Sequence, residues 1–386
     1  MTDSVVIIGG GISGVATAYE LALRGVKATL FEKSHLASMA SGWTLGGVRQ
    51  SGRHPAELPL SRAAVLRWAT LAAELGGETH YRQRGNLRIA RNEREADRIR
   101  DVVANTAKAG IEISYLPTAS DVQAIAPAIA PAIHSASFCP SDGHADPVST
   151  VNAYAHAAVH RGATVKTGVS VQSIDTHGGR IVGVTTSDGK FPCDRLILAS
   201  GVYTPRLLQP LGIEFPLNVT VVTAIQSIPV APFLDQVLGV ATGNLAARQE
   251  FTGCLRLTGS GKDWTPGLDA IRDSDDSLQP TPADLIEIRD VAVEVLPIFD
   301  KLSVRRVWGG LIDKTPDSLP VYSMSTGVEG LIIAAGFSGH GFCLGPVTGE
   351  ILADFVTGST PPFDLSAFRL DRFESLIAAE PIELHG

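Results

Sequence analysis

Residues 5–32 read VVIIGGGISGVATAYELALRGVKATLFE, and this stretch decides the fold. It opens with 5–8, a short apolar run rich in β-branched residues that is typical of a buried parallel strand. Three glycines follow with the spacing G-x-G-x-x-G, namely Gly9, Gly11 and Gly14. Apolar residues then recur at helical spacing over 12–23, and a second strand, 27–31, ends at Glu32. This order predicts a βαβ unit that binds a dinucleotide.

Each residue type in the motif has a physical role in that prediction. Gly9 allows the tight turn, Gly11 allows a pyrophosphate to approach the backbone, and Gly14 lets helix and strand pack closely. The helix N-terminus presents N–H groups to the phosphates. Glu32, eighteen residues after Gly14 (32 − 14), would accept hydrogen bonds from a ribose 2′-hydroxyl and repel a 2′-phosphate. The alternative is a tight turn that binds no ligand.

The composition is that of an enzyme with a large core. The chain has 386 residues, long enough for two domains, and a net charge of −8 without a basic block, which argues against nucleic acid as a partner. No apolar segment is long enough to span a bilayer, and the early glycine-rich turn argues against a signal peptide. The four cysteines are far apart, which favours reduced thiols in a cytoplasm and predicts no metal site: Cys139, Cys193, Cys254 and Cys343.

Helical and strand patterns alternate along the rest of the chain. Residues 34–53 are small, polar and glycine-rich, which is typical of a binding loop, and 259–278 is a second polar loop. Helices are expected at 57–75, 93–105, 120–125, 147–161, 282–296 and 344–355, with Ser120, Asp146 and Thr281 as N-caps. Strands are expected at 85–90, 111–116, 163–174, 180–186, 189–193, 194–201, 219–226, 239–258, 304–312 and 330–335.

Five motifs occur in a specific order. They are GGGISG at 9–14 with Glu32, DGHADP at 142–147, LILASG at 196–201, TPDSLP at 315–320 and AAGFSGHGF at 334–342. Together they resemble the flavin-dependent D-amino-acid oxidase and sarcosine oxidase family over roughly the whole chain. The resemblance implies an α/β fold, in which a discontinuous Rossmann-like FAD-binding domain carries an inserted antiparallel-sheet α+β substrate domain. The FAD-binding domain would comprise 1–80, 142–215 and 305–386, and the substrate domain 81–141 and 216–304.

The resemblance also implies the cofactor site. FAD would be bound non-covalently, because the stretch 309–314, where sarcosine oxidases attach flavin through a cysteine, contains none. The positive end of the turn at 336–341 would stabilise the negative charge of a reduced flavin. The cofactor residues expected are Gly9, Gly11, Ile12, Ser13, Gly14, Glu32, Lys33, Ser41, Gly42, Thr44, Leu45, Gly46, Gly47, Val171, Ala199, Ser200, Gly201, Gly336, Phe337, Ser338, Gly339, His340, Gly341 and Phe342.

Three side chains are candidates for substrate chemistry. Arg49 lies in the loop that the resemblance places over the flavin, where a planar guanidinium would bind a substrate carboxylate; the alternative is a solvated surface arginine. Arg248, in the expected substrate domain, is a second candidate of this kind. His340 could transfer a proton, or the turn that contains it could act through its backbone alone.

Cys343 departs from the family pattern. Monomeric sarcosine oxidases commonly have a lysine at this position, which serves as a second carboxylate ligand. A cysteine supplies no such charge and cannot bind a carboxylate as that lysine does, and Cys343 is interpreted as a small packing residue.

These observations predict an FAD-dependent oxidoreductase that acts on an amino acid or a secondary amino acid. A hydride would pass from the carbon that bears nitrogen to flavin N5, and the resulting imine would hydrolyse. The electron acceptor is oxygen, a quinone or a partner subunit; the lysine-free stretch 219–258 favours a dehydrogenase that reacts slowly with oxygen. The alternatives are a flavoprotein subunit that is inactive alone and a nicotinamide-dependent dehydrogenase.

Overall fold

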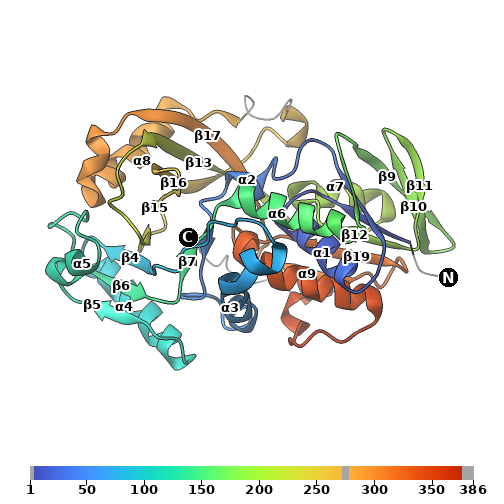
Figure 1. The fold of residues 1–386 in the computed structure, drawn as a ribbon, viewed down its shortest axis with the longest axis horizontal. Helices are drawn as coiled ribbons and strands as arrows, with labels where there is room; N and C mark the ends of the chain where they lie inside the picture. Colours follow the sequence, from blue (N-terminus) through green and yellow to red (C-terminus); the bar gives the residue numbers. More distant parts are fainter. Residues whose placement is uncertain (1–3, 272–277, 376–386) are drawn as a thin grey trace.

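A largely parallel six-stranded sheet forms one half of the molecule in the computed structural model, which describes residues 4–271 and 278–375 (Figure 1). The strand order is β18-β19-β12-β1-β2-β8, in which only the edge strand β18 runs antiparallel to its neighbour. The strands are β1 (Val5–Ile8), β2 (Ala28–Glu32), β8 (Thr164–Thr167), β12 (Arg195–Leu198), β18 (Val321–Met324) and β19 (Leu331–Ala335). The predicted βαβ unit is present, because β1 pairs in parallel with β2.

Both faces of this sheet are covered, as the apolar character of β1 requires. Val5 and Ile7 belong to the core that the sheet shares with helices, whereas Val6 and Ile8 pack into a second core on the opposite face. That opposite face is covered by an antiparallel meander, which comprises β9 (Val171–His177), β10 (Arg180–Thr186) and β11 (Gly189–Pro192).

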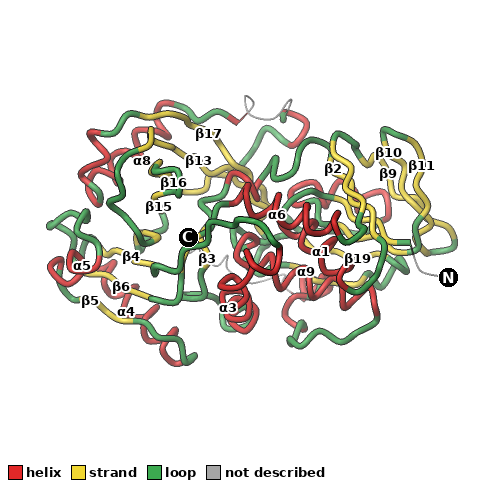
Figure 2. Tube along the Cα trace, in the orientation of Figure 1, coloured by secondary structure: helices red, strands yellow, loops and turns green. Residues whose placement is uncertain are grey.

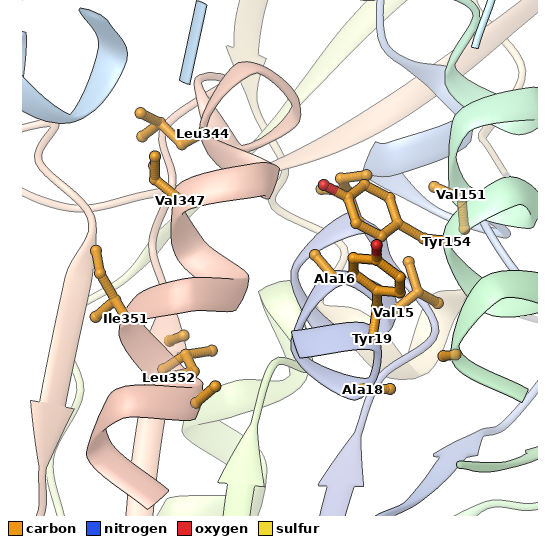
Figure 3. Close-up of a cluster of buried hydrophobic side chains, with 14 of the residues drawn as sticks. Val15, Ala16, Ala18, Tyr19, Val151, Tyr154, Leu344, Val347, Ile351 and Leu352 are labelled. Carbon is orange, nitrogen blue, oxygen red and sulfur yellow. The ribbon is translucent and has the colours of Figure 1, made fainter. Parts of the chain in front are cut away.

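Helix α1 lies at the centre of the helical layer. Figure 3 shows Val15 and Tyr19 of α1 facing Val151 and Tyr154 of α6, with α9 on the other side of α1. The α-helices are α1 (Ile12–Leu23), α2 (Ala40–Trp43), α3 (Leu58–Leu75), α4 (Glu93–Lys108), α5 (Ala119–Ile125), α6 (Pro147–His160), α7 (Thr204–Leu208), α8 (Pro282–Val295) and α9 (Gly341–Thr357). Helices α1 and α9 follow β1 and β19, which both run parallel to β12, so their N-termini lie at the same edge of the sheet.

An eight-stranded, mostly antiparallel sheet forms the other half (Figure 2). Its order is β17-β13-β16-β15-β14-β4-β6-β5, with β14 and β4 as a parallel pair. The strands are β4 (Asn86–Ala90), β5 (Ser114–Leu116), β6 (Ser135–Cys139), β13 (Asn218–Pro229), β14 (Val237–Val240), β15 (Ala246–Gln249), β16 (Cys254–Asp263) and β17 (Val304–Lys314). A small ribbon, β3 (Gly47–Val48) and β7 (Gly143–His144), lies between the two halves.

The larger sheet has its own apolar core. Leu87 and Ile89 of β4 point into it, together with Leu257 of β16 and with Ile288 and Ala292 of α8. Since side chains alternate along a strand, Asn86 and Arg88 of β4 project to the opposite face, towards the other half of the molecule. The domain boundaries expected from the sequence stay a prediction, although β17 pairs with β13 and so belongs to this sheet.

Several expected elements differ from the observed ones. The single strand expected at 163–174 is two, β8 and β9, because Gly168 turns the chain with φ 74°. The strand expected at 239–258 is three: β14, β15 and β16. The loop expected from 259 begins later, since β16 continues to Asp263; its residues 272–277 lie outside the described part.

Two helix starts were also placed wrongly. The first turn of α5 is capped by Thr118, not Ser120, in a reciprocal capping box with Asp121. Helix α9 begins at Gly341, three residues earlier than expected, and so belongs to the glycine-rich turn itself. The loop expected at 34–53 contains α2 and β3. In the described residues, no helix has the length and apolar character needed to cross a membrane.

Candidate active site

A cavity of about 720 Å³ lies between the two sheets. Its walls come from the first glycine-rich turn, the segment that contains α2, the end of β17, and the turn that leads into α9. Many of the predicted site residues line it: Gly11, Ile12, Ser13, Ser41, Thr44, Leu45, Gly47, Arg49, Ala199, Gly201, Phe337, Ser338, Gly339, His340, Gly341 and Phe342. Segments far apart in the sequence therefore meet at one cavity.

The three glycines of the first turn have different physical roles. A Cβ at Gly9 would lie 2.2 Å from the carbonyl oxygen of Ala199, and one at Gly14 would lie 1.9 Å from that of Gly9. These two glycines are therefore required by packing alone. At Gly11, the nearest atom to a Cβ is the side-chain oxygen of Ser41, at 2.9 Å, and Gly11 lines the cavity. The space beside Gly11 is what a pyrophosphate needs, so the turn fits the ADP half of FAD.

Glu32 braces this turn from the end of β2. Its carboxylate accepts hydrogen bonds from the N–H of Gly10 at 2.7 Å and from the N–H of Ser34 at 2.8 Å, one on each oxygen. Oε1 also accepts a long hydrogen bond from the Ser38 hydroxyl at 3.5 Å, whereas Oε2 has a further lone pair that can accept a hydrogen bond from a ribose. The neighbouring Lys33 places its ammonium 3.5 Å from the centre of the Tyr203 ring.

The second glycine-rich turn is shaped by buried hydrogen bonds. Positive φ angles occur at Gly336, Ser338 and Gly339. The side-chain carboxylate of Asp313 accepts a hydrogen bond from the N–H of Gly336 at 2.7 Å. The backbone carbonyl oxygen of Asp313 accepts a hydrogen bond from the N–H of Ser338 at 2.9 Å. Burial raises the pKa of Asp313 to about 6. The turn directs the N-terminus of α9, the positive end of its dipole, at the cavity.

His340 is held by a buried carboxylate. Its Nδ1 lies 2.9 Å from Oε2 of Glu57, so Nδ1–H is assigned as the donor and Nε2 keeps its lone pair. Burial and the positive charge of Arg53 lower the pKa of His340. Burial opposes ionisation of Glu57, but His340 and Arg53 outweigh it and hold the pKa of Glu57 at about 2. Glu57 thus orients the imidazole, and the lowered pKa of His340 favours its neutral form.

Arg49 is buried, with 7% of its surface exposed, and lines the cavity. This position excludes the solvated surface arginine. Burial, together with the charges of Arg53 and Arg88, lowers its pKa. Cys343 fixes the backbone of Arg49: its Sγ accepts from the Arg49 N–H at 3.3 Å and donates to the Arg49 carbonyl at 3.4 Å. The residue that departs from the family pattern thus supports the carboxylate-binding candidate.

Three arginines that the sequence analysis did not single out also line the cavity, and these are Arg53, Arg88 and Arg98. For Arg88, the sequence did contain a signal. Apolar and polar residues alternate along β4, so Leu87 and Ile89 predict the face that packs into the core and Arg88 is expected on the opposite face of the strand. No comparable local signal marks Arg53 or Arg98.

Other predicted residues lie behind the walls of the cavity. Arg248 is fully buried beside the Gly46 loop, and one of its terminal nitrogens donates to Nδ1 of His144 at 3.3 Å. Burial lowers the pKa of Arg248 to about 9. Val171 lies at the start of β9, against the core of the meander. Besides these two, the predicted residues outside the cavity lining are Gly9, Gly14, Glu32, Lys33, Gly42, Gly46, Ser200 and Gly336. The described residues contain no cluster of His, Cys, Asp and Glu that could hold a metal ion.

Comparison with known proteins agrees with this geometry. The family model described as FAD dependent oxidoreductase (DAO) matches residues 4–355. Sarcosine oxidase subunit beta of Rhizobium meliloti (strain 1021) is 26% identical over 381 residues, which cover 96% of this chain and 88% of that protein. The crystal structure of L-proline dehydrogenase from P. horikoshii superposes with a TM-score of 0.88 and 27% identity, covering 97% of this chain and 98% of that one.

A further relative is much longer than this chain. The 4-methylaminobutanoate oxidase (formaldehyde-forming) of Paenarthrobacter nicotinovorans is 25% identical over 378 residues, which cover 95% of this chain but 45% of that protein.

Proposed function

Because the chain belongs to the DAO family of FAD-dependent oxidoreductases, we propose that it oxidises the C–N bond of an N-substituted amino acid whose carboxylate is bound by Arg49. One observation carries this proposal. The buried guanidinium of Arg49 lies on the same cavity as both glycine-rich turns, so a carboxylate bound there is held beside the cofactor. The similarity to a sarcosine oxidase subunit and to an L-proline dehydrogenase supports an amino-acid substrate with a secondary amine.

Different residues would bind the cofactor and the substrate. The first turn and Glu32 would hold the ADP half of FAD, and the turn at 336–341 would hold the flavin. When bound, FAD supplies the two-electron oxidation of the C–N bond. Arg49 binds and orients the substrate carboxylate, which fixes the reacting carbon relative to the cofactor site.

His340 in its neutral form, oriented by Glu57, can accept a proton from the substrate amine at Nε2. FAD is bound without a covalent link: 309–314 contains no cysteine, and the thiol of Cys343 is occupied by the backbone of Arg49.

The electron acceptor is part of the proposal. The sequence favoured slow reaction with oxygen because it showed no lysine in 219–258, but Lys314, at the end of β17, lines the cavity. Positive charge near the cofactor helps oxygen to accept an electron, so that premise does not hold for the cavity as a whole. Oxygen, a quinone and a partner subunit all remain in the proposal. The four cysteines are free thiols, which supports a cytoplasmic location.

A second candidate function is that of one subunit of a heteromeric enzyme. The likeness to sarcosine oxidase subunit beta over 88% of that protein favours it. Gel filtration of the isolated chain, combined with an activity assay, separates the two candidates: activity from a single species supports the self-sufficient enzyme, and a yellow but inactive chain supports the subunit.

Product analysis tests the function. The purified protein is incubated with N-alkyl amino acids and an artificial dye as acceptor, and the carbonyl and amine products are quantified. One carbonyl and one amine formed per dye molecule reduced by two electrons is the expected result. Dye reduction without cleavage of the C–N bond would show that the substrate class is wrong.

A further inference from the structure

We propose that Arg256 is a positioning residue for FAD, and that it acts through the loop at 44–47 without touching the cofactor. Thr44, Leu45 and Gly47 of this loop line the cavity, whereas Arg256 is not among the described residues that line it. The inference rests on the proposed function in one respect, namely that this cavity holds FAD. It goes further because it gives the eight-stranded sheet a part in cofactor binding.

Arg256 lies on the face of the eight-stranded sheet that points towards the other half of the molecule. Thr258, two residues further along β16, lines the cavity, and side chains alternate along a strand, so Arg256 projects on the same side. Its guanidinium lies 5.2 Å from the centre of the Trp308 ring on β17. Stacking on an indole restrains the plane of a guanidinium.

This planar group joins a buried carboxylate to the loop. Nε of Arg256 donates to Oε1 of Glu250 at 2.5 Å, and Nη1 donates to the carbonyl oxygen of Thr44 at 2.7 Å. The side chains of Arg256 and Glu250 are 10% and 4% exposed, so water competes little for either bond. Both bonds are charge-assisted and therefore stronger than those between neutral groups.

Glu250 is itself fixed by its neighbours. Its Oε2 accepts a hydrogen bond from Nε2 of Gln226 at 2.8 Å and another from the hydroxyl of Thr252 at 3.1 Å. A buried carboxylate with these donors and a cationic partner is compensated, and moving any member leaves a charge or a polar group without its bond. Glu250 therefore holds Arg256, and Arg256 in turn holds the backbone at Thr44.

The loop depends on such contacts for its shape. Gly46 has a φ of 81° and Gly47 follows it, so the isolated segment could adopt many conformations. The carbonyl oxygen of Gly46 accepts a hydrogen bond from the N–H of Ala145 at 2.9 Å, which ties the loop to the start of α6. With Thr44 held by Arg256 as well, this wall of the cavity is ordered before FAD binds, and the cost of ordering it on binding is avoided.

The rate at which FAD leaves the holoprotein tests this inference. Arg256→Lys keeps a positive charge beside Glu250, but its one nitrogen replaces the two that bind Glu250 and Thr44 separately. The holoprotein is diluted, and the recovery of free FAD fluorescence gives the rate of release. Release from Arg256→Lys should be faster than from the wild type by about tenfold or more, as expected for the loss of one charge-assisted hydrogen bond.

Glu250→Gln tests the second half of the link. A neutral amide holds the guanidinium less firmly than a carboxylate does, so this variant should also release FAD faster than the wild type. Both variants are unfolded thermally with FAD in excess. Midpoints close to that of the wild type, together with faster release, distinguish positioning of the loop from a general loss of stability.

Arg306→Lys is the matched control. Arg306 is exposed, and its guanidinium lies 5.1 Å from the centre of the same Trp308 ring. It should release FAD at the wild-type rate. Release from Arg306→Lys that is accelerated as much as release from Arg256→Lys would overturn the inference, because stacking on Trp308 would then explain both effects.

The remaining outcomes separate this inference from the proposed function. Wild-type release rates in both Arg256→Lys and Glu250→Gln would overturn the inference and leave the proposed function intact. A wild-type protein that neither contains FAD when purified nor binds it when it is added would overturn both.

Discussion

Arg49 shows how a single side chain acquires its role from distant parts of the chain. It follows β3 in a loop, but its backbone is fixed by Cys343 on α9, and Asp142 and Glu57 offset part of the effect of burial and of neighbouring arginines on its charge. These contacts hold the Arg49 guanidinium in the wall of the cavity. A substrate carboxylate fits that position.

The variant Arg49→Lys tests this role. Lysine keeps the positive charge but cannot make the two parallel hydrogen bonds of a guanidinium, so kcat/KM for the amino-acid substrate should fall by the equivalent of about 2–5 kcal/mol. Flavin content should not change, because FAD contacts are expected from other residues. Arg94→Lys, on the exposed face of α4, is the control. Unaltered steady-state kinetics of Arg49→Lys would refute the assignment.

His144 makes a prediction about stability and pH. Its Nδ1 accepts from Arg248, its ring also donates to the backbone of Asp235, and burial followed by the charges of Arg248 and Arg82 lowers its pKa to about 3. In the unfolded chain the pKa is near 6.5. The unfolded state therefore binds a proton below pH 6.5 that the folded state does not, and the stability present above pH 6.5 is lost as the pH falls towards 3.

The size of this effect can be measured by thermal unfolding. Between pH 6.5 and 4 the single group contributes a loss of about 3 kcal/mol, at roughly 1.4 kcal/mol per pH unit. His144→Gln keeps a neutral donor and acceptor, so its unfolding midpoint should fall less steeply over this range than that of the wild type. Parallel curves for the two proteins would show that His144 is not the group responsible.

At the residue scale, the sequence identified candidate site residues only where they lie in or near a recognisable motif. Arg49 was singled out because the family resemblance places the loop after Glu32 over the flavin, and His340 because it lies inside the second glycine-rich turn; both line the cavity. Arg53 and Arg98 were not found, because their place in the cavity depends on how α4 and the segment at 52–58 pack against the other half of the molecule. Such packing leaves no periodic signal in the sequence.

At the scale of helices and strands, too, some elements were predicted correctly and others were not. The βαβ unit was predicted correctly because glycine spacing, strand pattern and helical spacing agreed. The start of α9 was missed because glycines at 336, 339 and 341 argue locally for a loop, whereas tertiary contacts hold the helix from Gly341 onward. The strand expected at 163–174 was divided by Gly168, whose positive φ a strand pattern does not reveal.

Two glycine substitutions in the first turn separate folding from cofactor binding. Gly11→Val should give a folded but colourless protein, since a Cβ at this position meets only the Ser41 side chain yet fills the space for the pyrophosphate. Gly14→Ala should lower the free energy of unfolding by about 1–3 kcal/mol, because its Cβ would lie 1.9 Å from the Gly9 carbonyl oxygen.

Circular dichroism and flavin absorbance of the two variants check this pair. The prediction requires that Gly11→Val lose less stability than Gly14→Ala, because it disturbs only the hydrogen bond from the Ile12 N–H to Ser41. A Gly11→Val protein that retains its yellow colour would contradict the placement of the ADP half, and a Gly14→Ala protein as stable as the wild type would contradict the packing role.

At the scale of the whole molecule, the arrangement of two sheets around one cavity could be inferred only from the family resemblance. The larger sheet places β14 in parallel beside β4, two strands about 150 residues apart in sequence. Hydrophobic patterns locate such strands but do not say which of them are neighbours. The cavity and the position of Lys314 both depend on that order.

Lys314 provides a test of reaction with oxygen. If its ammonium stabilises the charge that develops on oxygen, Lys314→Met should slow reoxidation of the reduced protein about tenfold, equivalent to about 1.4 kcal/mol. Stopped-flow mixing of the reduced protein with air-saturated buffer measures the rate. Lys262→Met is the control, since Lys262 is exposed and paired with Asp284 and Glu287. Equal reoxidation rates in all three proteins would exclude Lys314 from this role.

The central claim, that this protein oxidises the C–N bond of an amino acid with FAD, is tested most directly by anaerobic mixing. The yellow holoprotein is combined with a panel of N-alkyl amino acids in the absence of oxygen, and the flavin absorbance is followed. The account predicts that at least one member of the panel bleaches the flavin completely, with one carbonyl product formed for each flavin reduced. A flavin that dithionite bleaches but that no amino acid in the panel reduces would contradict it.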